Sequence, residues 1–310
     1  MIKYFSPLLP FIAAFAVFSC SAVFSEPGWI NGAAQLVLFA LVVCWPIWST
    51  GRMSYVDIGW PLGLVLIGLV TVLLADGHWV RKALVCAAYV FAGLRMGLGA
   101  LLLWKNGRLK VEFPRYEYQK RRWEKAGKDN TALAMQVEAL VQGVANATFL
   151  ALPAFIIAAN PNPEISPFEI VGLVIWLGAF VMESIADRQK LAFLLRMKKE
   201  GKSRQVCNVG LWRYSRHPNY FAEWMVWNGL LFAAIPSWWA LADTMHMTLW
   251  LLLGFGSLYA SVLMYKTLVY YTGAVPSEFY SLQKRPDYER YQAETNRFFP
   301  GPVKANNKSI

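Results

Sequence analysis

Long apolar stretches with few charged residues recur along this chain of 310 residues. Several are close to the roughly 20 residues that a helix needs to cross about 30 Å of hydrocarbon, so they predict membrane-spanning helices. The pattern therefore predicts an all-α, polytopic membrane bundle of about eight spans. The expected spans are residues 5–24, 29–48, 58–75, 83–104, 133–158, 167–186, 221–241 and 247–271.

Basic residues are concentrated in the polar segments that follow the fourth, sixth and eighth spans. Lys and Arg accumulate in cytoplasmic loops, so an eight-span chain with this distribution has both termini in the cytoplasm. Arg81 and Lys82 fall on the opposite side and are outnumbered. The net charge of +11 is thus explained by membrane topology, and we expect no nucleic-acid partner.

The first span follows Lys3 and could be a secretory signal, but no small-x-small cleavage site precedes Glu26 and further spans follow at once. We expect a retained helix, with cleavage as the alternative. The four cysteines and three histidines show no metal-ligand spacing, which predicts neither a disulfide framework nor a metal site. The chain has no P-loop, no Gly-rich dinucleotide fingerprint and no broken-helix pair typical of transporters.

Residues 210–229 combine basic, aromatic and amide side chains with the start of an apolar helix. Pro218 suits the first turn of that helix, and Asn219 and Glu223 then share one face. The free N–H groups and positive dipole at a helix start favour an anionic ligand. Asn, Tyr and Glu side chains suit a carboxamide or ribose, and Arg213 and Arg216 suit phosphates.

Several charged residues lie within or beside the spans, where an unpaired charge is costly and usually faces a cavity or a partner. Glu183, Asp187 and Lys190 would lie along one face of a continuous helix, as a wall of a ligand site or as an interfacial ion-pair ladder. The following residues, 191–198, could form an amphipathic helix at the membrane surface. Arg95 lies deep in the fourth span and stays open between a structural and a functional role.

Three segments carry a family resemblance: Ser184–Phe193, Gly210–Glu223 and Arg285–Tyr291. Together with Ser54–Trp60 and the segment from Gly93-Leu-Arg95 to Arg115-Tyr116, they resemble the steroid 5-alpha-reductase-like membrane family, in its bacterial branch of uncharacterised domain proteins. The resemblance covers about residues 50–302 and favours residues 1–49 as added N-terminal spans before a reductase-like domain of residues 50–310. Its cofactor site would lie in about residues 183–302. The His-Pro-x-Tyr…Glu element also occurs in isoprenylcysteine carboxyl methyltransferases, which bind S-adenosylmethionine.

The resemblance implies an NADPH-dependent reductase of the CH–CH class, which reduces a C=C bond conjugated to a carbonyl in a steroid-like or isoprenoid-like lipid. It implies a bacterial cytoplasmic membrane as the location and membrane lipids as the surroundings. The implied cofactor-binding residues are Glu183, Asp187, Lys190, Arg213, Tyr214, Arg216, His217, Asn219, Tyr220, Glu223, Arg285 and Tyr288.

In the steroid enzymes a Glu and a Tyr from earlier helices hold the ketone. Asp57 stands near the position of that Glu, and Tyr55 is the catalytic tyrosine that we expect, with Tyr89 as another candidate. Asp57 could instead be a helix N-cap or a partner of Arg95. No residue of the chain matches the Tyr of the steroid enzymes closely, and this departure favours an enone or polyprenyl-type lipid over a steroid. Two alternatives stay open: a membrane methyltransferase using S-adenosylmethionine, and a membrane protein without enzymatic activity.

Overall fold

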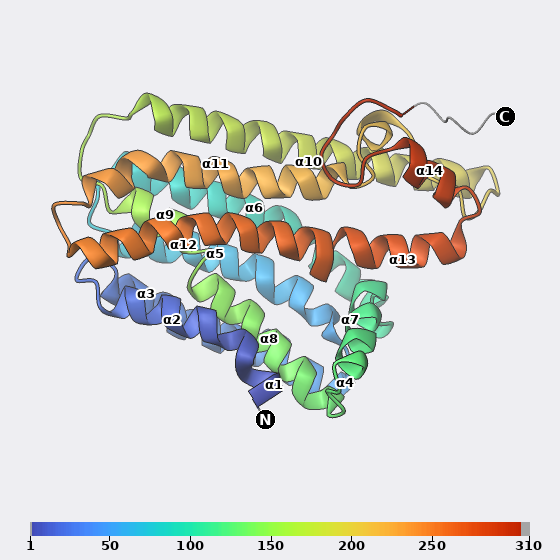
Figure 1. The fold of residues 1–310 in the computed structure, drawn as a ribbon, viewed down its shortest axis with the longest axis horizontal. Coiled ribbons are helices and arrows are strands. Elements are labelled where there is room, and N and C mark those ends of the chain that lie inside the picture. Colours follow the sequence, from blue (N-terminus) through green and yellow to red (C-terminus); the bar gives the residue numbers. More distant parts are fainter. Residues whose placement is uncertain (1, 305–310) are drawn as a thin grey trace. The chain divides into compact units, whose positions relative to one another are not determined.

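The computed structural model describes residues 2–304, and every regular element within them is helical (Figure 1). The chain divides into two compact units. Unit 1 comprises Met1–Gly172 and Leu230–Ala260, and unit 2 comprises Leu173–Gly229 and Ser261–Ile310. Three long helices contribute residues to both units: α10 (Pro167–Lys199), α11 (Pro218–Ala240) and α12 (Met247–Lys266).

The remaining helices each belong to one unit. Unit 2 contains α13 (Ala274–Lys284) and α14 (Tyr288–Glu294). Unit 1 contains α1 (Ile2–Phe5), α2 (Leu9–Ser19), α3 (Ser25–Phe39), α4 (Trp45–Thr50), α5 (Val56–Leu74), α6 (Trp79–Lys105), α7 (Pro114–Lys125), α8 (Thr131–Ala147) and α9 (Leu152–Ala158).

Seven helical segments of the described residues are long and apolar enough to span a membrane. They are Ile2–Ser19, Ser25–Thr50, Met53–Leu74, Trp79–Lys105, Thr131–Ala158, Pro167–Lys199 and Met247–Lys284. The predicted all-α polytopic bundle is thereby confirmed. The predicted span 221–241 is also helical, as α11, but is not among the seven, and its Asn, Glu and Pro residues lower its hydropathy.

Helix α10 extends well beyond the predicted span 167–186. Its 33 residues are about 50 Å long at 1.5 Å per residue, more than the roughly 30 Å of a hydrocarbon core. The sequence had predicted a possible separate surface helix over residues 191–198, whereas these residues form the last turns of α10. Glu183, Asp187 and Lys190 therefore do lie on one continuous helix, as expected.

Helices α5 and α6 run side by side in unit 1 (Figure 1), and glycines allow their backbones to approach closely. A Cβ atom on Gly93 would lie 2.5 Å from the carbonyl oxygen of Pro61, and one on Gly68 would lie 3.1 Å from that of Cys86. Small residues at such contacts let membrane helices associate by close packing, since lipid provides no hydrophobic driving force between helices.

Three amides form a polar network in the core of unit 1, where α3, α5 and α8 meet. Asn31, Gln35 and Asn146 are each at most 1 % exposed. Gln35 donates to the Asn31 side chain at 3.2 Å and to the carbonyl oxygen of Gly63 at 2.8 Å. Asn146 donates to the carbonyl oxygen of Trp60 at 3.0 Å. Interhelical amide bonds of this kind hold membrane helices in register.

Replacing Gly63 with alanine should destabilise the protein by about 1–3 kcal/mol, the usual cost of overpacking a core. The new Cβ atom would lie 2.1 Å from Asn146 Nδ2 and 2.5 Å from Gln35 Oε1, and neither buried amide can move without breaking the network. Gly99→Ala on α6 is the matched control, because nothing lies within 4 Å of its Cβ position. Thermal unfolding in detergent measures both variants, and equal melting temperatures would contradict the prediction.

The predicted span 133–158 is broken into α8 and α9 by residues 148–151, which are not helical. Pro153 at the start of α9 fits this break, because proline favours the first turn of a helix. The carbonyl groups at the break are satisfied within the protein. Thr148 Oγ1 donates to Val144 O, Asn31 donates to Asn146 O and the Tyr89 hydroxyl donates to Leu150 O. This agrees with the rule that irregular backbone at membrane depth must be buried in protein or line a cavity.

The first span packs into unit 1. Tyr4, Phe11 and Phe18 are at most 7 % exposed, and the ring centroids of Phe11 and Phe18 lie 5.5 and 5.6 Å from those of Phe149 and Phe155. The Tyr4 hydroxyl accepts from the backbone N–H of Asn130 at 3.0 Å. The first span is thus part of the packing of unit 1.

Arg81, which disagreed with the predicted topology, is buried in an ion pair. Its Nε and Nη2 atoms lie 2.6 and 2.9 Å from the two carboxylate oxygens of Glu169, and the two side chains are 2 % and 3 % exposed. It also donates to the carbonyl oxygens of Asn162 and Glu164. A neutralised, buried arginine is a structural link between α6 and the start of α10, which explains why its charge opposes the general pattern.

Candidate functional site

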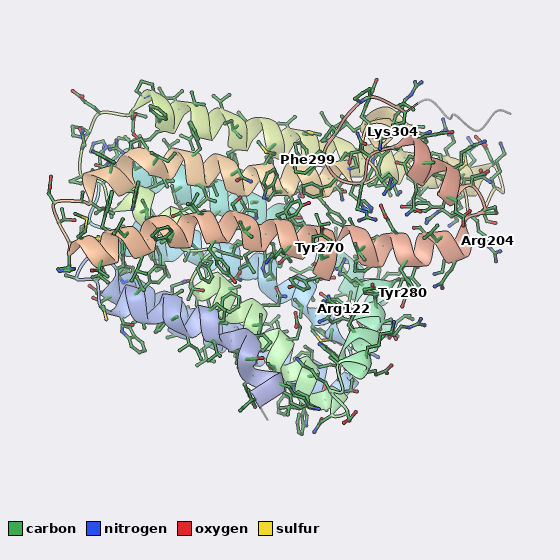
Figure 2. All side chains as sticks on the ribbon, viewed as in Figure 1. Arg122, Arg204, Tyr270, Tyr280, Phe299 and Lys304 are labelled. Carbon is green, nitrogen blue, oxygen red and sulfur yellow. The ribbon has the colours of Figure 1, made fainter. Side chains whose placement is uncertain are left out.

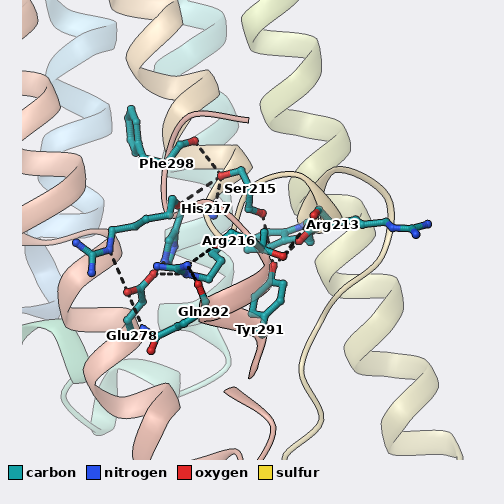
Figure 3. A network of polar contacts seen from close by, with 11 residues as sticks. Arg213, Ser215, Arg216, His217, Glu278, Tyr291, Gln292 and Phe298 are labelled. Carbon is teal, nitrogen blue, oxygen red and sulfur yellow. Dashed lines mark hydrogen bonds and ion pairs between the residues drawn. The ribbon is translucent and has the colours of Figure 1, made fainter. Parts of the chain in front are cut away.

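A densely bonded polar cluster of unit 2 is centred on Glu278 of α13 (Figure 3). Its Oε1 atom accepts from Arg216 Nε at 2.7 Å and lies 3.2 Å from His217 Nε2. Its Oε2 atom accepts from Gln292 Nε2 at 3.0 Å and from Arg297 Nε at 3.1 Å. The carboxylate thus ties the segment before α11 to the end of the described chain.

Residues 291–301, which we name the C-terminal strap, bind residues 212–217 through backbone groups. The N–H of Arg216 donates to Asn296 O at 2.9 Å, and the Ser215 hydroxyl donates to Phe298 O at 2.9 Å. Arg216 Nη1 also donates to Gln292 O at 2.9 Å. These bonds join positions far apart in sequence, so the strap determines the conformation of the Arg-His-Pro segment.

The strap also packs aromatic side chains against α11 and α12. Phe299 is labelled in Figure 2. Its ring centroid lies 5.8 Å from that of Trp224 and 6.1 Å from that of Tyr265. Phe298 lies 5.2 Å from Tyr265 in an edge-to-face arrangement, a favoured geometry for aromatic pairs. The Phe-Phe-Pro sequence near the C-terminus is therefore part of the packing of unit 2.

The loop before the strap-bound segment is fixed on α10. Gly210 has a φ of +54°, and a Cβ atom there would lie 2.4 Å from the Gln189 side chain. Gln189 Oε1 accepts from the N–H of Leu211 at 2.9 Å. Lys190 Nζ lies 4.2 Å from the centroid of the Trp212 ring, a cation–π contact. Glycine is required at this position because its backbone is left-handed and the space for a side chain is filled.

Burial shifts the titration of the aromatic and imidazole groups near Glu278. Burial lowers the pKa of His217, and the hydrogen bond and charge of Glu278 oppose this shift only in part. Burial also raises the pKa of Tyr288 to about 12, and the charge of Glu278 adds to the rise. His217 is therefore neutral near pH 7 and Tyr288 keeps its proton.

The structure places the predicted cofactor residues in two groups. Arg216 and His217 are at most 7 % exposed and bind Glu278, while Arg285 binds Ser281 Oγ at 2.7 Å and Gln205 O at 3.2 Å. These three residues hold the architecture of unit 2 together. Arg213 is exposed, and its guanidinium points away from the Glu278 cluster (Figure 3). Tyr214 is also exposed.

Asn219 of α11 and Asp187 of α10, which the family resemblance implied as two of the cofactor-binding residues, are in contact. Asn219 Nδ2 donates to Asp187 Oδ1 at 3.2 Å. The Asn219 Oδ1 atom is buried and has no hydrogen-bond partner among the described residues. Tyr220 lies nearly parallel to the His217 ring, with centroids 5.4 Å apart, and Glu183 is buried on the same helix as Asp187. A buried, unpaired acceptor marks a position for a ligand N–H or O–H group.

A second polar cluster lies in unit 1, at the beginning of α5. The Tyr116 hydroxyl donates to Asp57 Oδ1 at 2.7 Å, and Arg115 binds the other carboxylate oxygen. Tyr116 is 5 % exposed. Asp57 stands in the first turn of α5, whose N-cap is Tyr55, so the N-cap alternative is wrong. Tyr55 is half-buried and packs against Ile58, Ala100 and Leu109.

Three residues in or beside these clusters, Tyr116, Glu112 and Glu278, had no predicted role. Tyr116 was noted only as part of a family segment. Glu112 accepts from the N–H of Met53 at 2.7 Å and from the Ser54 hydroxyl at 2.6 Å, and so holds the start of α5. Glu278 follows the last predicted span in a tail that also holds Asp287, Glu289 and Glu294, so its position in the sequence did not single it out.

The family profile described as "Protein of unknown function (DUF1295)" matches residues 45–295. The chain belongs to the DUF1295 family. This family includes steroid 5-alpha-reductase-like proteins. The matched range of this DUF1295 protein contains the Asp57–Tyr116 cluster and most of the Glu278 cluster, whereas the first span lies outside it.

A similar protein is "Uncharacterized protein C594.04c" of Schizosaccharomyces pombe, which is 28 % identical over 168 residues. The similarity covers 49 % of this DUF1295 protein and 44 % of the yeast protein. The chain thus matches less than half the length of that relative. No solved structure gives a significant match.

Proposed function

We propose that this DUF1295 protein is an NADPH-dependent reductase that reduces a C=C bond conjugated to a carbonyl in a lipid-like molecule. The observation that carries the proposal is the Tyr116 hydroxyl, held 2.7 Å from Asp57 Oδ1. It pairs a buried tyrosine with the acid that stands near the Glu position of the steroid enzymes. Tyr116 replaces Tyr55 as the proposed catalytic tyrosine.

Reduction of an enone adds a hydride to the β carbon and a proton at the α carbon or carbonyl oxygen. Negative charge develops on that oxygen, so the site needs a proton donor and a positive group close to it. Burial, followed by the charge of Asp57, raises the pKa of Tyr116 well above its ordinary value, so the hydroxyl is protonated and can donate. A hydroxyl can rotate from one acceptor to another. Arg115, bound to the other Asp57 oxygen, supplies the positive charge.

Unit 2 supplies the proposed cofactor residues. NADPH, when bound, provides the hydride. The amide of Asn219 and the carboxylate of Asp187 suit ribose hydroxyls or the carboxamide, and the unpaired Asn219 Oδ1 fits a ligand donor. The exposed Arg213 suits a phosphate, as does the start of the 23-residue helix α11. Arg216 and His217 would act by positioning this segment through Glu278.

The polar cluster of unit 1 supports a substrate that enters from the membrane. Asp57 stands at the head of the candidate span Met53–Leu74. The other residues of the cluster, Arg115 and Tyr116, come from α7, where Tyr116 and Trp123 are buried. A lipid with a polar enone end and an apolar remainder suits this position. The proposed substrate class is therefore an isoprenoid-like or steroid-like enone, with no further preference among them.

The test is nucleotide binding by the detergent-purified protein, measured as a thermal shift with NADPH, NADH and S-adenosylmethionine. NADPH at 100 times its Kd should stabilise the protein by about 2.7 kcal/mol. The effect should disappear in Asn219→Ala and in Glu223→Ala and persist in Glu200→Ala, a control whose carboxylate forms an exposed ion pair. Stabilisation by S-adenosylmethionine alone would assign a methyltransferase instead, and no response to any of the three would refute a nucleotide site.

A further inference from the structure

Unit 1 contains a hollow that the proposed reaction does not use. It has a volume of about 280 Å³ and lies between α2, the break that separates α8 from α9, and α12. Its walls include Ala14, Phe18, Phe149, Leu152, Leu253 and Gly256. The residues are almost all apolar, and small ones create the space.

Water is a poor occupant of this hollow. The hollow is large enough for several water molecules, and every buried water needs two to four polar partners. The lining side chains offer two hydroxyl groups, of Thr148 and Tyr259. The Thr148 hydroxyl already donates to Val144 O at 2.6 Å. The chemistry of the walls therefore favours hydrocarbon.

The hollow opens toward the surroundings of the spans rather than toward a polar surface. Its walls come from the candidate membrane spans Ile2–Ser19, Thr131–Ala158 and Met247–Lys284. At its edge Phe255 is 65 % and Leu252 44 % exposed. The break at residues 148–151 forms part of the wall, and irregular backbone at membrane depth is tolerated where it is buried or lines a cavity.

We propose that this hollow is a binding site for one acyl chain of a membrane phospholipid, which enters sideways from the bilayer. Phospholipid supplies the hydrocarbon that surrounds membrane spans, and a flexible linear chain can enter between α2 and α12, which both line the hollow. The bound chain fills the space beside the helix break and keeps it dry. The inference does not depend on the proposed reductase activity.

The experiment places the full-length protein in nanodiscs of phosphatidylethanolamine and phosphatidylglycerol. A trace of phosphatidylethanolamine carries a photoreactive diazirine at the end of one acyl chain, and cross-linked positions are mapped by mass spectrometry. We expect several-fold more cross-linking at Phe149, Leu152 and Leu253, which are at most 7 % exposed, than at Leu36 and Val37. The latter two are 60 % and 57 % exposed on α3 and report ordinary lipid contact.

Gly256→Leu should fill the hollow and lower cross-linking at Phe149 and Leu152 several-fold. Its Cβ atom would lie 3.2 Å from Leu152 Cδ2 and 3.9 Å from Phe149 Cε1, so the rest of the side chain enters the free space. If cross-linking in the wild-type protein is stronger at the exposed Leu36 and Val37 than at the buried residues of the hollow, the proposal is overturned. This result does not depend on whether the variant folds. Displacement of the label by a polyprenol, but not by excess unlabelled phospholipid, would overturn the choice of occupant.

Discussion

Replacing Glu278 with alanine is expected to lower the free energy of unfolding by about 3–5 kcal/mol, the usual cost of breaking a buried ion pair from one side. Arg216 Nε lies 2.7 Å from Glu278, and the two side chains are 7 % and 4 % exposed. Without the carboxylate, the guanidinium is left buried with a positive charge that only carbonyl groups offset. Gln292 and Arg297 lose the same acceptor. Thermal unfolding of the purified protein measures the loss.

Glu200→Ala is the matched control for Glu278→Ala. Glu200 also has two cationic neighbours, Lys202 at 2.9 Å and Arg196 at 3.9 Å, but all three side chains are solvent-exposed. Surface ion pairs contribute little to stability, so this variant should melt like the wild type. The double variant Arg216→Met with Glu278→Leu should recover much of the loss, because apolar residues of similar volume often replace a buried pair without cost. Equal melting temperatures for Glu278→Ala and Glu200→Ala would refute the structural role of the cluster.

Tyr116→Phe is expected to lower turnover of a lipid enone by about 10²–10⁴-fold, the usual contribution of general acid catalysis. The variant removes the hydroxyl that bonds Asp57 at 2.7 Å and leaves the ring and the Arg115 ion pair in place. Turnover is followed as loss of NADPH absorbance with an isoprenoid α,β-unsaturated ketone and with a steroid enone. NADPH binding, which we assign to unit 2, should be unchanged in the same thermal-shift assay.

Tyr118→Phe, on the same helix two residues later, is the control and should retain activity. It removes one hydroxyl from a half-buried tyrosine that has no assigned part in the reaction. Wild-type turnover in Tyr116→Phe would exclude this tyrosine as the proton donor without affecting the nucleotide-binding result. Loss of activity together with loss of NADPH stabilisation would instead indicate a folding defect.

Topological signals in the sequence were local, and the structure shows where a local signal misleads. Arg81 counted against the predicted orientation because a loop charge was assumed to be solvated. In the structure Glu169, 88 positions later, binds that charge in a buried pair. Likewise, the arginine that we had expected beside phosphates, Arg216, is bonded to Glu278, 62 positions later. Neither partner could be recognised, because nothing in the spacing of such distant residues indicates contact.

The candidate catalytic tyrosine shows the same limit. Asp57 was found from its position at the head of an apolar span, and Tyr55 and Tyr89 were the candidates for the tyrosine of the family. The fold instead brings Tyr116 to Asp57, across 59 positions. The pairing depends on how α7 packs beside the start of α5, and this packing cannot be read from a single sequence.

The sequence alone determined the membrane-spanning helices, because each residue contributes its own transfer free energy into hydrocarbon. The composition of a segment therefore shows directly whether it can span the membrane. The sequence also indicated the polar segment before α11 and the common helix of Glu183, Asp187 and Lys190, since both depend on helix starts and helical spacing. The tertiary structure decided which charges are solvated, which tyrosine meets Asp57 and where the span at residues 133–158 breaks. These features depend on hydrogen bonds between distant helices, and their energies exist only once the helices have packed.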